Sequence, residues 1–157
     1  MTISIVSTIY GRGKDSLVKY MTRIRLTPYT KWGHLRLHIF WRGDGDPDPH
    51  DHPFDFWTFP LATYHEMVVG EDGIERDNTI RRFQWHFRKA EHIHRVVGRV
   101  AYTPRQTGRP FLTLVWASNW KRKWGFWPVV AKAYSDLSRG RLRRIERKFV
   151  PWKEYLG

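Results

Sequence analysis

Histidines and a glutamate that can bind a metal ion are gathered in three short runs: His50-Asp-His52, Tyr64-His-Glu66 and His92-Ile-His94. Side chains two residues apart leave the same face of an extended strand. The first and third runs therefore each present two imidazoles on one side, and Glu66 adds a carboxylate from the run between them. Such a mixed set suits Fe, Mn, Ni, Co or Zn and leaves coordination positions open for substrate or water. Either His92 or His94 can supply the third imidazole.

The loop before His50 is rich in aspartate, and its carboxylates could orient the imidazoles: Asp44, Asp46, Asp48 and Asp51. Alternating aspartates also occur in calcium loops, but this loop lacks the required glycine and glutamate and contains two prolines. Calcium is therefore excluded. The other histidines we considered, His34, His38 and His86, have no partner at ligand spacing, and we expect them on the surface or half-buried in strands.

The composition limits the remaining chemistry. The 157 residues include eight histidines and no cysteine, which excludes disulfide scaffolds, thiolate metal sites and cysteine nucleophiles. The chain lacks an apolar run of about 20 residues and the long apolar segment of a signal peptide, so we expect a cytoplasmic protein without a membrane span. Serine hydrolase and nucleotide-binding motifs are absent.

The charge of +13 is unevenly distributed along the chain. Residues 44–77 contain ten acidic residues and one basic residue, which gives −9. The segment from Lys121 to the end contains eleven Lys or Arg and three acids, which gives +8. A basic segment favours polyanionic partners such as nucleic acid, and a solvated face that keeps the protein soluble is an equal alternative.

The order of hydrophobic and polar residues predicts mostly strands. Alternating, aromatic and β-branched runs separated by turn residues indicate strands over residues 34–41, 54–61, 64–69, 79–87, 92–100 and 111–117. A short helix is expected after an N-cap at Asp15 or Ser16, and basic helices are expected over residues 129–137 and 141–148. We therefore predict an all-β antiparallel jelly roll or barrel (residues 1–127) with short N- and C-terminal helices. Residues 128–157 form its basic helical tail.

The sequence resembles the cupin superfamily, and in particular small cupin-like proteins encoded by phages and bacteria. The resemblance extends from about Leu35 to Trp127 and is carried by the runs His50-Asp-His-Pro-Phe-Asp-Phe-Trp57, Tyr64-His-Glu66 and His94-Arg95-Val96. It implies that His50, His52 and His94 are metal ligands and that Glu66 is the carboxylate. In cupins the glutamate is normally separated from the second histidine by three or four residues, where this chain has Phe56 and Trp57. Either Glu66 therefore reaches the metal from the adjacent strand, or the site has three histidines.

Two kinds of function follow from these observations. The first is a metal-dependent cupin enzyme, with an Fe(II) oxygenase preferred and Zn, Mn or Ni as other ions, acting on a small molecule or a nucleic acid. Tyr64 would donate a proton, Glu66 would act as base or ligand, and Arg95 would bind a substrate anion; Arg81 and Arg82 are further candidates for that last role. The alternative is a nucleic-acid-binding or virion-associated protein whose metal only stabilises the barrel. Either form could be a homodimer.

Overall fold

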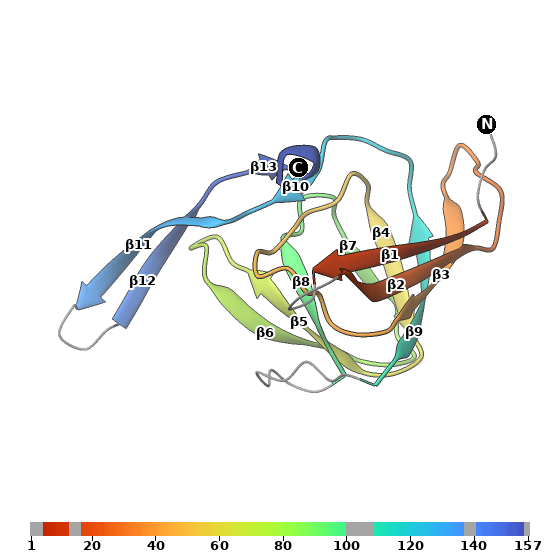
Figure 1. Cartoon of the computed structure of the whole chain (residues 1–157), viewed down its shortest axis with the longest axis horizontal. Helices are drawn as coiled ribbons and strands as arrows, with labels where there is room; N and C mark the ends of the chain where they lie inside the picture. Colours follow the sequence, from red (N-terminus) through yellow and green to blue (C-terminus); the bar gives the residue numbers. More distant parts are fainter. Residues whose placement is uncertain (1–4, 13–16, 100–108, 137–140, 156–157) are drawn as a thin grey trace.

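The computed structural model describes residues 5–12, 17–99, 109–136 and 141–155, and their regular secondary structure is almost entirely strand (Figure 1). In chain order these are β1 (Val6–Arg12), β2 (Leu17–Arg25), β3 (His34–Phe40), β4 (Phe56–Pro60), β5 (Tyr64–Val69), β6 (Glu75–Ile80), β7 (His86–Arg88), β8 (His94–Gly98), β9 (Phe111–Ala117), β10 (Gly125–Phe126), β11 (Val129–Asp136), β12 (Arg141–Arg147) and β13 (Val150–Pro151). One helix, α1 (Trp152–Tyr155), has four residues. None of the described helical residues forms a segment long and apolar enough to span a lipid bilayer.

Two antiparallel sheets form the body of the protein. The larger has the order β1-β2-β3-β9-β4-β7, and the smaller has the order β6-β5-β8. Strand β3 pairs with β9 along its whole length, from His34–Ala117 to Phe40–Phe111, and β9 pairs with β4 on its other side. Strand β9 thus joins β3 and β4, from which it is distant in sequence, and the predicted all-β antiparallel architecture is confirmed.

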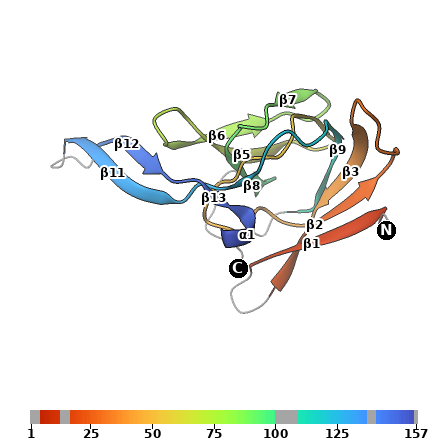
Figure 2. The same cartoon turned by 90° about the horizontal axis from the view of Figure 1, so that it is seen from above.

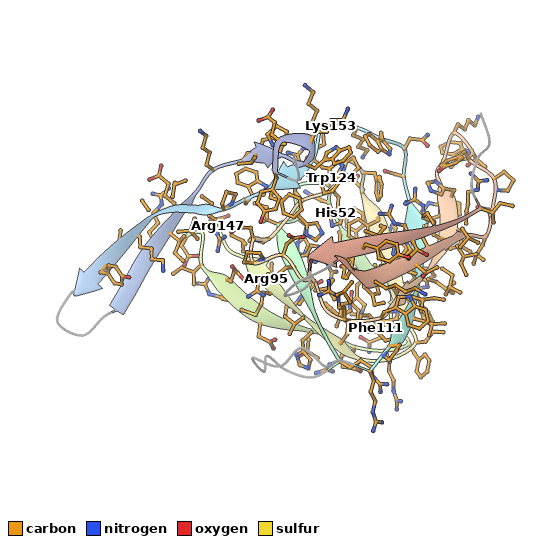
Figure 3. All side chains as sticks on the ribbon, in the orientation of Figure 1. His52, Arg95, Phe111, Trp124, Arg147 and Lys153 are labelled. Carbon is orange, nitrogen blue, oxygen red and sulfur yellow. The ribbon has the colours of Figure 1, made fainter. Side chains whose placement is uncertain are left out.

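The apolar core gathers around Phe111. Its ring stacks on those of Phe40 and Tyr64, with 4.8 Å between centroids in both pairs. The rest of the buried cluster consists of Met21, Ile80 and Val96. Each such side chain contributes about 1.5–3 kcal/mol when it is fully buried. Figure 3 shows Phe111 well separated from His52 and Trp124, so the core leaves another part of the interior for polar residues.

Strand β3 turns polar side chains inward. His34 and Arg36 are buried, with 2% and 9% of their surface exposed, whereas Leu35 and Leu37 between them are only half-buried. His38 is half-buried. The expectation of a surface or half-buried position was therefore wrong for His34. The reason is that β3 lies in the middle of the larger sheet, where its alternation places the polar positions toward the smaller sheet.

The helices expected near the N-terminus and over residues 129–137 and 141–148 are replaced by strands. Residues Leu17–Arg25 form β2, which pairs with β1 and β3, so the N-terminal helix was wrong. Its proposed caps, Asp15 and Ser16, lie outside the described residues. The helices expected over residues 129–137 and 141–148 were also wrong, because β11 and β12 pair as an antiparallel hairpin. β-Branched and aromatic residues favour strands, and pairing satisfies backbone groups that a short isolated helix holds only marginally.

The predicted strands agree better with the structure. Residues 34–41, 54–61, 64–69, 92–100 and 111–117 contain β3, β4, β5, β8 and β9. The strand expected over residues 79–87 is divided between β6 and β7. Phe83 interrupts it with a positive φ of 59°, and its amide donates to the carbonyl of Pro60 (2.9 Å).

The C-terminal residues form a projecting hairpin and a short segment that packs on the barrel. The β11–β12 hairpin projects away from the barrel in both views (Figures 1 and 2). Strand β13 and α1 then return, because β13 pairs with β10 and the Tyr155 ring stacks on Phe126 with 3.9 Å between centroids. The Tyr155 hydroxyl donates to Asp48 (2.9 Å). Strand β13 and α1 are therefore part of the wall beside the histidines.

Candidate metal centre

Three predicted ligands converge at one point. The candidate ligand nitrogens of His50, His52 and His94 all lie within 4.8 Å of one another. The two Nε2 atoms of His52 and His94 are 2.9 Å apart. Two nitrogens that bind one ion at a right angle, at about 2.1 Å each, would be about 3.0 Å apart. The spacing therefore fits a single ion.

Backbone pairing between two distant segments creates this convergence. The amide of His50 donates to the carbonyl of His94 (2.8 Å), and the amide of His94 donates back to His50 (3.0 Å). His52 follows two residues later, and its amide donates to Ala90 (2.9 Å). The His-x-His parity thus carries both imidazoles to the side where His94 lies, while Asp51 points away.

Glu66 lies behind His94 as seen from the other imidazoles. Its Oε2 is 2.8 Å from Nδ1 of His94, the nitrogen opposite the one that faces His52. Its other oxygen accepts hydrogen bonds from Arg88 (2.8 Å) and Asn78 (3.1 Å). Glu66 is fully buried, so this network accounts for its charge. The carboxylate favours the His94 tautomer whose Nε2 has a free lone pair.

A second group of potential ligands shares His94. Glu66, His92 and His94 also place one ligand atom each within 4.8 Å of the others. In this group Nε2 of His92 lies 3.5 Å from Oε1 of Glu66. That oxygen already accepts from Arg88, and a cation there would lie against a guanidinium. In the described part of the chain, the polar contacts of the three imidazoles are with one another, Glu66 and Asp44, and none is with an arginine or lysine.

The aspartates near the histidines have separate roles. Oδ2 of Asp44 lies 3.2 Å from Nδ1 of His50, which leaves Nε2 of that ring for an ion. Asp51 is fully buried and accepts from the Gly125 amide (2.8 Å), Arg122 (2.7 Å) and the Trp127 indole (3.2 Å). Asp51 therefore ties residues 122–127 to the histidine segment instead of orienting an imidazole.

Burial favours the neutral form of His52 and of His94. It holds the pKa of His52 well below its usual value, and the neighbouring histidines lower that pKa further. Burial also lowers the pKa of His94, although Glu66 opposes the shift. Burial alone would raise the pKa of Glu66, but His94, His92 and Arg88 hold it below its usual value. Neutral imidazoles are the form that binds a metal, so the donor set fits a divalent transition ion.

Aromatic side chains surround the three imidazoles. The Phe56 ring lies 4.5 Å from that of His52, and Phe126 lies 5.8 Å from His50. Trp124 is 6.3 Å from His50 and stacks on Trp152 of α1. Helix α1 thus supports part of the aromatic wall around the site.

Two other predicted site residues lie apart from the imidazoles. Tyr64 belongs to the apolar core, where burial and the charge of Glu66 raise its pKa and keep its hydroxyl protonated. Arg95 follows His94 and points to the opposite side of β8, where Nε donates to Glu75 (2.7 Å). Glu75 also accepts from Arg147 of β12 (2.8 Å), so Arg95 helps to anchor the hairpin. Arg81 and Arg82 are exposed.

Sequence reasoning missed Arg88 and Asn78, the partners of Glu66. Asn78 lies directly opposite Glu66 in the β5–β6 pair, so a correct hairpin register would have found it. Arg88 comes from β7 in the other sheet, and no local pattern in the sequence connects it with Glu66.

Comparisons with known proteins support the fold. No family model matches the chain, and no curated protein sequence matches it significantly. Among solved structures it resembles a cupin-2 domain protein from Rhodospirillum rubrum, with a TM-score of 0.50 and 13% identity over 85% of this chain and 80% of that one. Fe(II)-HppE with the alternative substrate (S)-1-HPP gives a TM-score of 0.49 and 14% identity over 71% of this chain and 55% of that one. DMSP lyase DddQ from Ruegeria pomeroyi DSS-3 gives 0.47 and 17% identity over 67% and 50%. The chain thus spans about half the length of these two enzymes, and its fold is that of cupin domains.

Proposed function

We propose that this chain with a cupin fold is a metal-dependent enzyme whose ion is held by His50, His52 and His94. The observation that carries the proposal is the convergence of three imidazoles, two of them with Nε2 atoms 2.9 Å apart, beside a buried carboxylate. Fe(II) is our first choice of ion, and an oxygenase-type reaction on a small molecule is our first choice of activity. Zn, Mn and Ni suit the same donors.

A divalent transition ion bound by three imidazoles keeps positions open for substrate and acts as a Lewis acid or, if it is iron, a redox centre. The residues of this chain prepare the site. Glu66 fixes the orientation of His94, and Asp44 lies against His50. Phe56, Phe126 and Trp124 surround the imidazoles with aromatic rings. In this proposal Glu66 is a positioning residue, since its oxygens are engaged by His94, Arg88 and Asn78.

Metal analysis of protein purified without a histidine tag tests the proposal. We expect about one transition ion per chain, lost in His52→Ala, and oxygen consumption when the iron-loaded protein meets its substrate. Stoichiometric zinc with no redox activity would favour a structural metal. A parent protein that binds no transition ion after incubation with Fe(II), Mn(II), Ni(II) or Zn(II) would refute the proposal.

A second candidate function is nucleic-acid binding through the β11–β12 hairpin. The observation that favours it is that the basic C-terminal residues form a projecting two-stranded ribbon (Figure 1). A two-stranded β-ribbon fits the major groove of DNA. Lys132 and Arg144 on this ribbon are exposed, whereas Arg147 at its base is held by Glu75 and the carbonyls of Gly73 and Trp127. The ribbon could present a nucleic acid to the metal site or act alone.

A further inference from the structure

Four neighbouring basic side chains of β2 and β3 lie together on the inner face of the larger sheet, beside Phe40 of the apolar core. This cationic cluster consists of Arg23, His34, Arg36 and His38. The three residues of β3 alternate on one face, and Arg23 of β2 is directly opposite His38 in the antiparallel pair. Cross-strand neighbours on one face have Cβ atoms about 4.5–5.5 Å apart, so the four side chains share one region of the interior.

The cationic cluster has no acidic partner among the described residues. The arginines that do form ion pairs in the described part of the chain lie outside the cluster. They are Arg76, Arg88, Arg95, Arg122 and Arg147. The contacts of Arg36 are with His34, Phe54 and Tyr29, none of which is acidic. Its Nε donates to Nε2 of His34 (2.5 Å), its guanidinium lies over the Phe54 ring (5.3 Å to the centroid), and it also hydrogen-bonds the Tyr29 side chain. Burial lowers the pKa of Arg23 to about 10, so its guanidinium remains charged at neutral pH.

Several nitrogen atoms of the cationic cluster also lack hydrogen-bond partners. These buried atoms are Nε of Arg23, Nδ1 of His34 and Nε2 of His38. Since Nε2 of His34 accepts from Arg36, its Nδ1 carries the proton and is an unused donor. Buried charges are normally paired, and buried donors normally have acceptors. Two guanidinium groups with unused imidazole donors are therefore complementary to an oxyanion.

The cationic cluster adjoins the imidazoles through one aromatic ring. Phe54 contacts the Arg36 guanidinium, and its centroid lies 6.3 Å from that of His52. A small organic molecule could thus place an oxyanion near Arg36 and another group near the metal. We propose that the cationic cluster binds the carboxylate or phosphoryl group of the substrate on which the metal centre acts. This inference rests on the proposed function for its substrate, whereas anion binding itself needs no metal.

The test is anion binding by the metal-free full chain. Calorimetry and thermal unfolding would be followed with sodium phosphate, sulfate and acetate, against sodium chloride at the same ionic strength. We expect at least one oxyanion to bind saturably and to raise the melting temperature beyond the chloride control. Tighter phosphate binding would assign a phosphoryl group, and tighter acetate binding would assign a carboxylate. No saturable binding of any of these anions would overturn the proposal.

Substitutions locate the binding site. Arg36→Met and Arg23→Met should each weaken anion binding at least tenfold. Exposed Arg82 provides the matched control, since Arg82→Met removes the same charge and should leave the dissociation constant unchanged. Without anion, Arg36→Met should melt no lower than the parent, because it removes an uncompensated buried charge. If Arg36→Met does not fold, Arg36→Lys is the substitute. It keeps the positive charge but loses the paired N–H donors of the guanidinium, so it should still bind the anion more weakly than the parent. Equal anion affinity in parent and cluster variants would overturn the proposal.

A metal measurement separates this inference from the proposed function. His52→Ala should lose the ion and keep the anion affinity of the metal-free parent. A parent that binds oxyanions through Arg36 but no metal would refute the metal enzyme and retain the anion site. A parent with stoichiometric metal and no oxyanion binding would do the reverse.

The opposite face of the same sheet carries a continuous apolar surface. Trp57, Trp116 and Phe87 form one cross-strand row, and Trp57 and Phe87 are 44% and 43% exposed. The other exposed or partly exposed members are Leu35, Leu37, Ile39, Phe59, Phe83, Trp85, Leu112 and Leu114. The outward positions of β3, β4 and β9 contain no charged residue. The face is therefore unsuited to the polyanions that the rest of this basic chain attracts.

We infer that this apolar face binds a second copy of the chain. Its exposed aromatic groups, at roughly 100 Å² each, and its partly exposed aliphatic groups supply roughly 700 Å². A standard interface buries about 800 Å² per partner. Two sheets related by a two-fold axis can pack such faces together. Because each copy carries +13, we expect added salt to strengthen the dimer, whereas it weakens nucleic-acid binding.

Sedimentation equilibrium of the full chain tests the dimer. The parent should be dimeric at micromolar concentration, and Trp57→Lys and Trp116→Lys should each weaken association at least tenfold. Trp120→Lys is the control, because Trp120 is 68% exposed and lies outside the face. A parent that stays monomeric at 100 mM and 500 mM salt, or variants that associate like the parent, would overturn the inference.

Discussion

The carboxylate of Glu66 contacts His94 on the nitrogen that faces away from the other imidazoles. Oε2 lies 2.8 Å from Nδ1, while Nε2 of the same ring is 2.9 Å from Nε2 of His52. One ring therefore connects a buried anion to the proposed ligand position. This arrangement raises the basicity of the metal-binding nitrogen and restricts the rotation of the ring. It also explains how a carboxylate distant in sequence from the His-x-His run can act on the same site.

The first prediction concerns His52. Replacing it by alanine should abolish stoichiometric metal binding, because one of three imidazoles is lost. Metal should stabilise the parent by about 4 kcal/mol at a thousandfold excess over its dissociation constant, and this gain should disappear in the variant. Metal content and melting temperature would be measured with and without chelator. His65→Ala is the control, since His65 faces Asp77 on the other side of β5. Equal metal content in parent and His52→Ala would contradict the three-imidazole site.

The second prediction concerns Glu66→Gln. If Glu66 positions His94, metal affinity should fall about 10- to 100-fold without being abolished. The fold should also lose stability, because Arg88 keeps a buried charge without its partner. Adding Arg88→Met should recover stability but not metal affinity. Unchanged affinity with loss of activity would instead identify Glu66 as a general base.

The third prediction is a pH dependence of folding to which His34 and His38 contribute, in addition to His52 and His94. Burial, Arg36 and Arg25 lower the pKa of His34 to about 4, and burial with Arg23 and Arg36 lowers that of His38. Between pH 6.5 and about 4 the unfolded chain binds protons that the folded chain does not. The contribution of each histidine to the free energy of unfolding should therefore be complete above pH 6.5. It should decrease as the pH falls below 6.5, by up to about 1.4 kcal/mol per pH unit.

Urea unfolding of the metal-free protein at pH 7.5 and pH 5 measures this dependence. His34→Gln and His38→Gln should each reduce the difference between the two pH values, whereas His65→Gln, outside the cationic cluster, serves as the control. A difference as large in both cluster variants as in the parent would assign the acid sensitivity to other groups.

The sequence was most informative where one strand alone determines the arrangement. The parity of His50 and His52 is a property of any extended chain, and β5 and β9 begin and end where their residue types indicated. The tertiary pairing of His50 with His94 could be expected from the cupin resemblance but not from spacing. Arg88 could not be found at all, since it reaches Glu66 from the other sheet.

The errors in the sequence-based prediction have a common physical origin. Leu17–Arg25 and Val129–Asp136 fit a helical period as well as a strand period, and their strand pairing is a tertiary effect. The wrong expectation for His34, on the inward face of β3, has a related reason. Alternation shows that two faces differ, but it does not show that the polar one lies inside, as it does for His34 and Arg36.

The last prediction concerns the basic hairpin. If the β11–β12 hairpin binds nucleic acid, reversing the charge at Arg139, Arg141, Arg143 and Arg144 should weaken DNA or RNA binding. Arg139 lies outside the described residues, and the other three belong to β12. The parent's binding constant should fall with salt by a log–log slope of about −0.7 to −0.9 per phosphate contacted. Fluorescence anisotropy at 50–300 mM salt would measure both effects.

The matched control reverses four exposed charges on the barrel, at Arg81, Arg82, Lys89 and Arg99. It changes the net charge by the same amount, so general attraction of a basic protein for polyanions should fall equally in both variants. A specific role of the hairpin requires a larger loss of affinity and a shallower salt slope in the hairpin variant. Arg141, Arg143 and Arg144 belong to a ribbon that projects from the body, so the barrel and its metal content should be unaffected (Figure 2). Equal losses in the two variants would leave the hairpin as a solvated basic face.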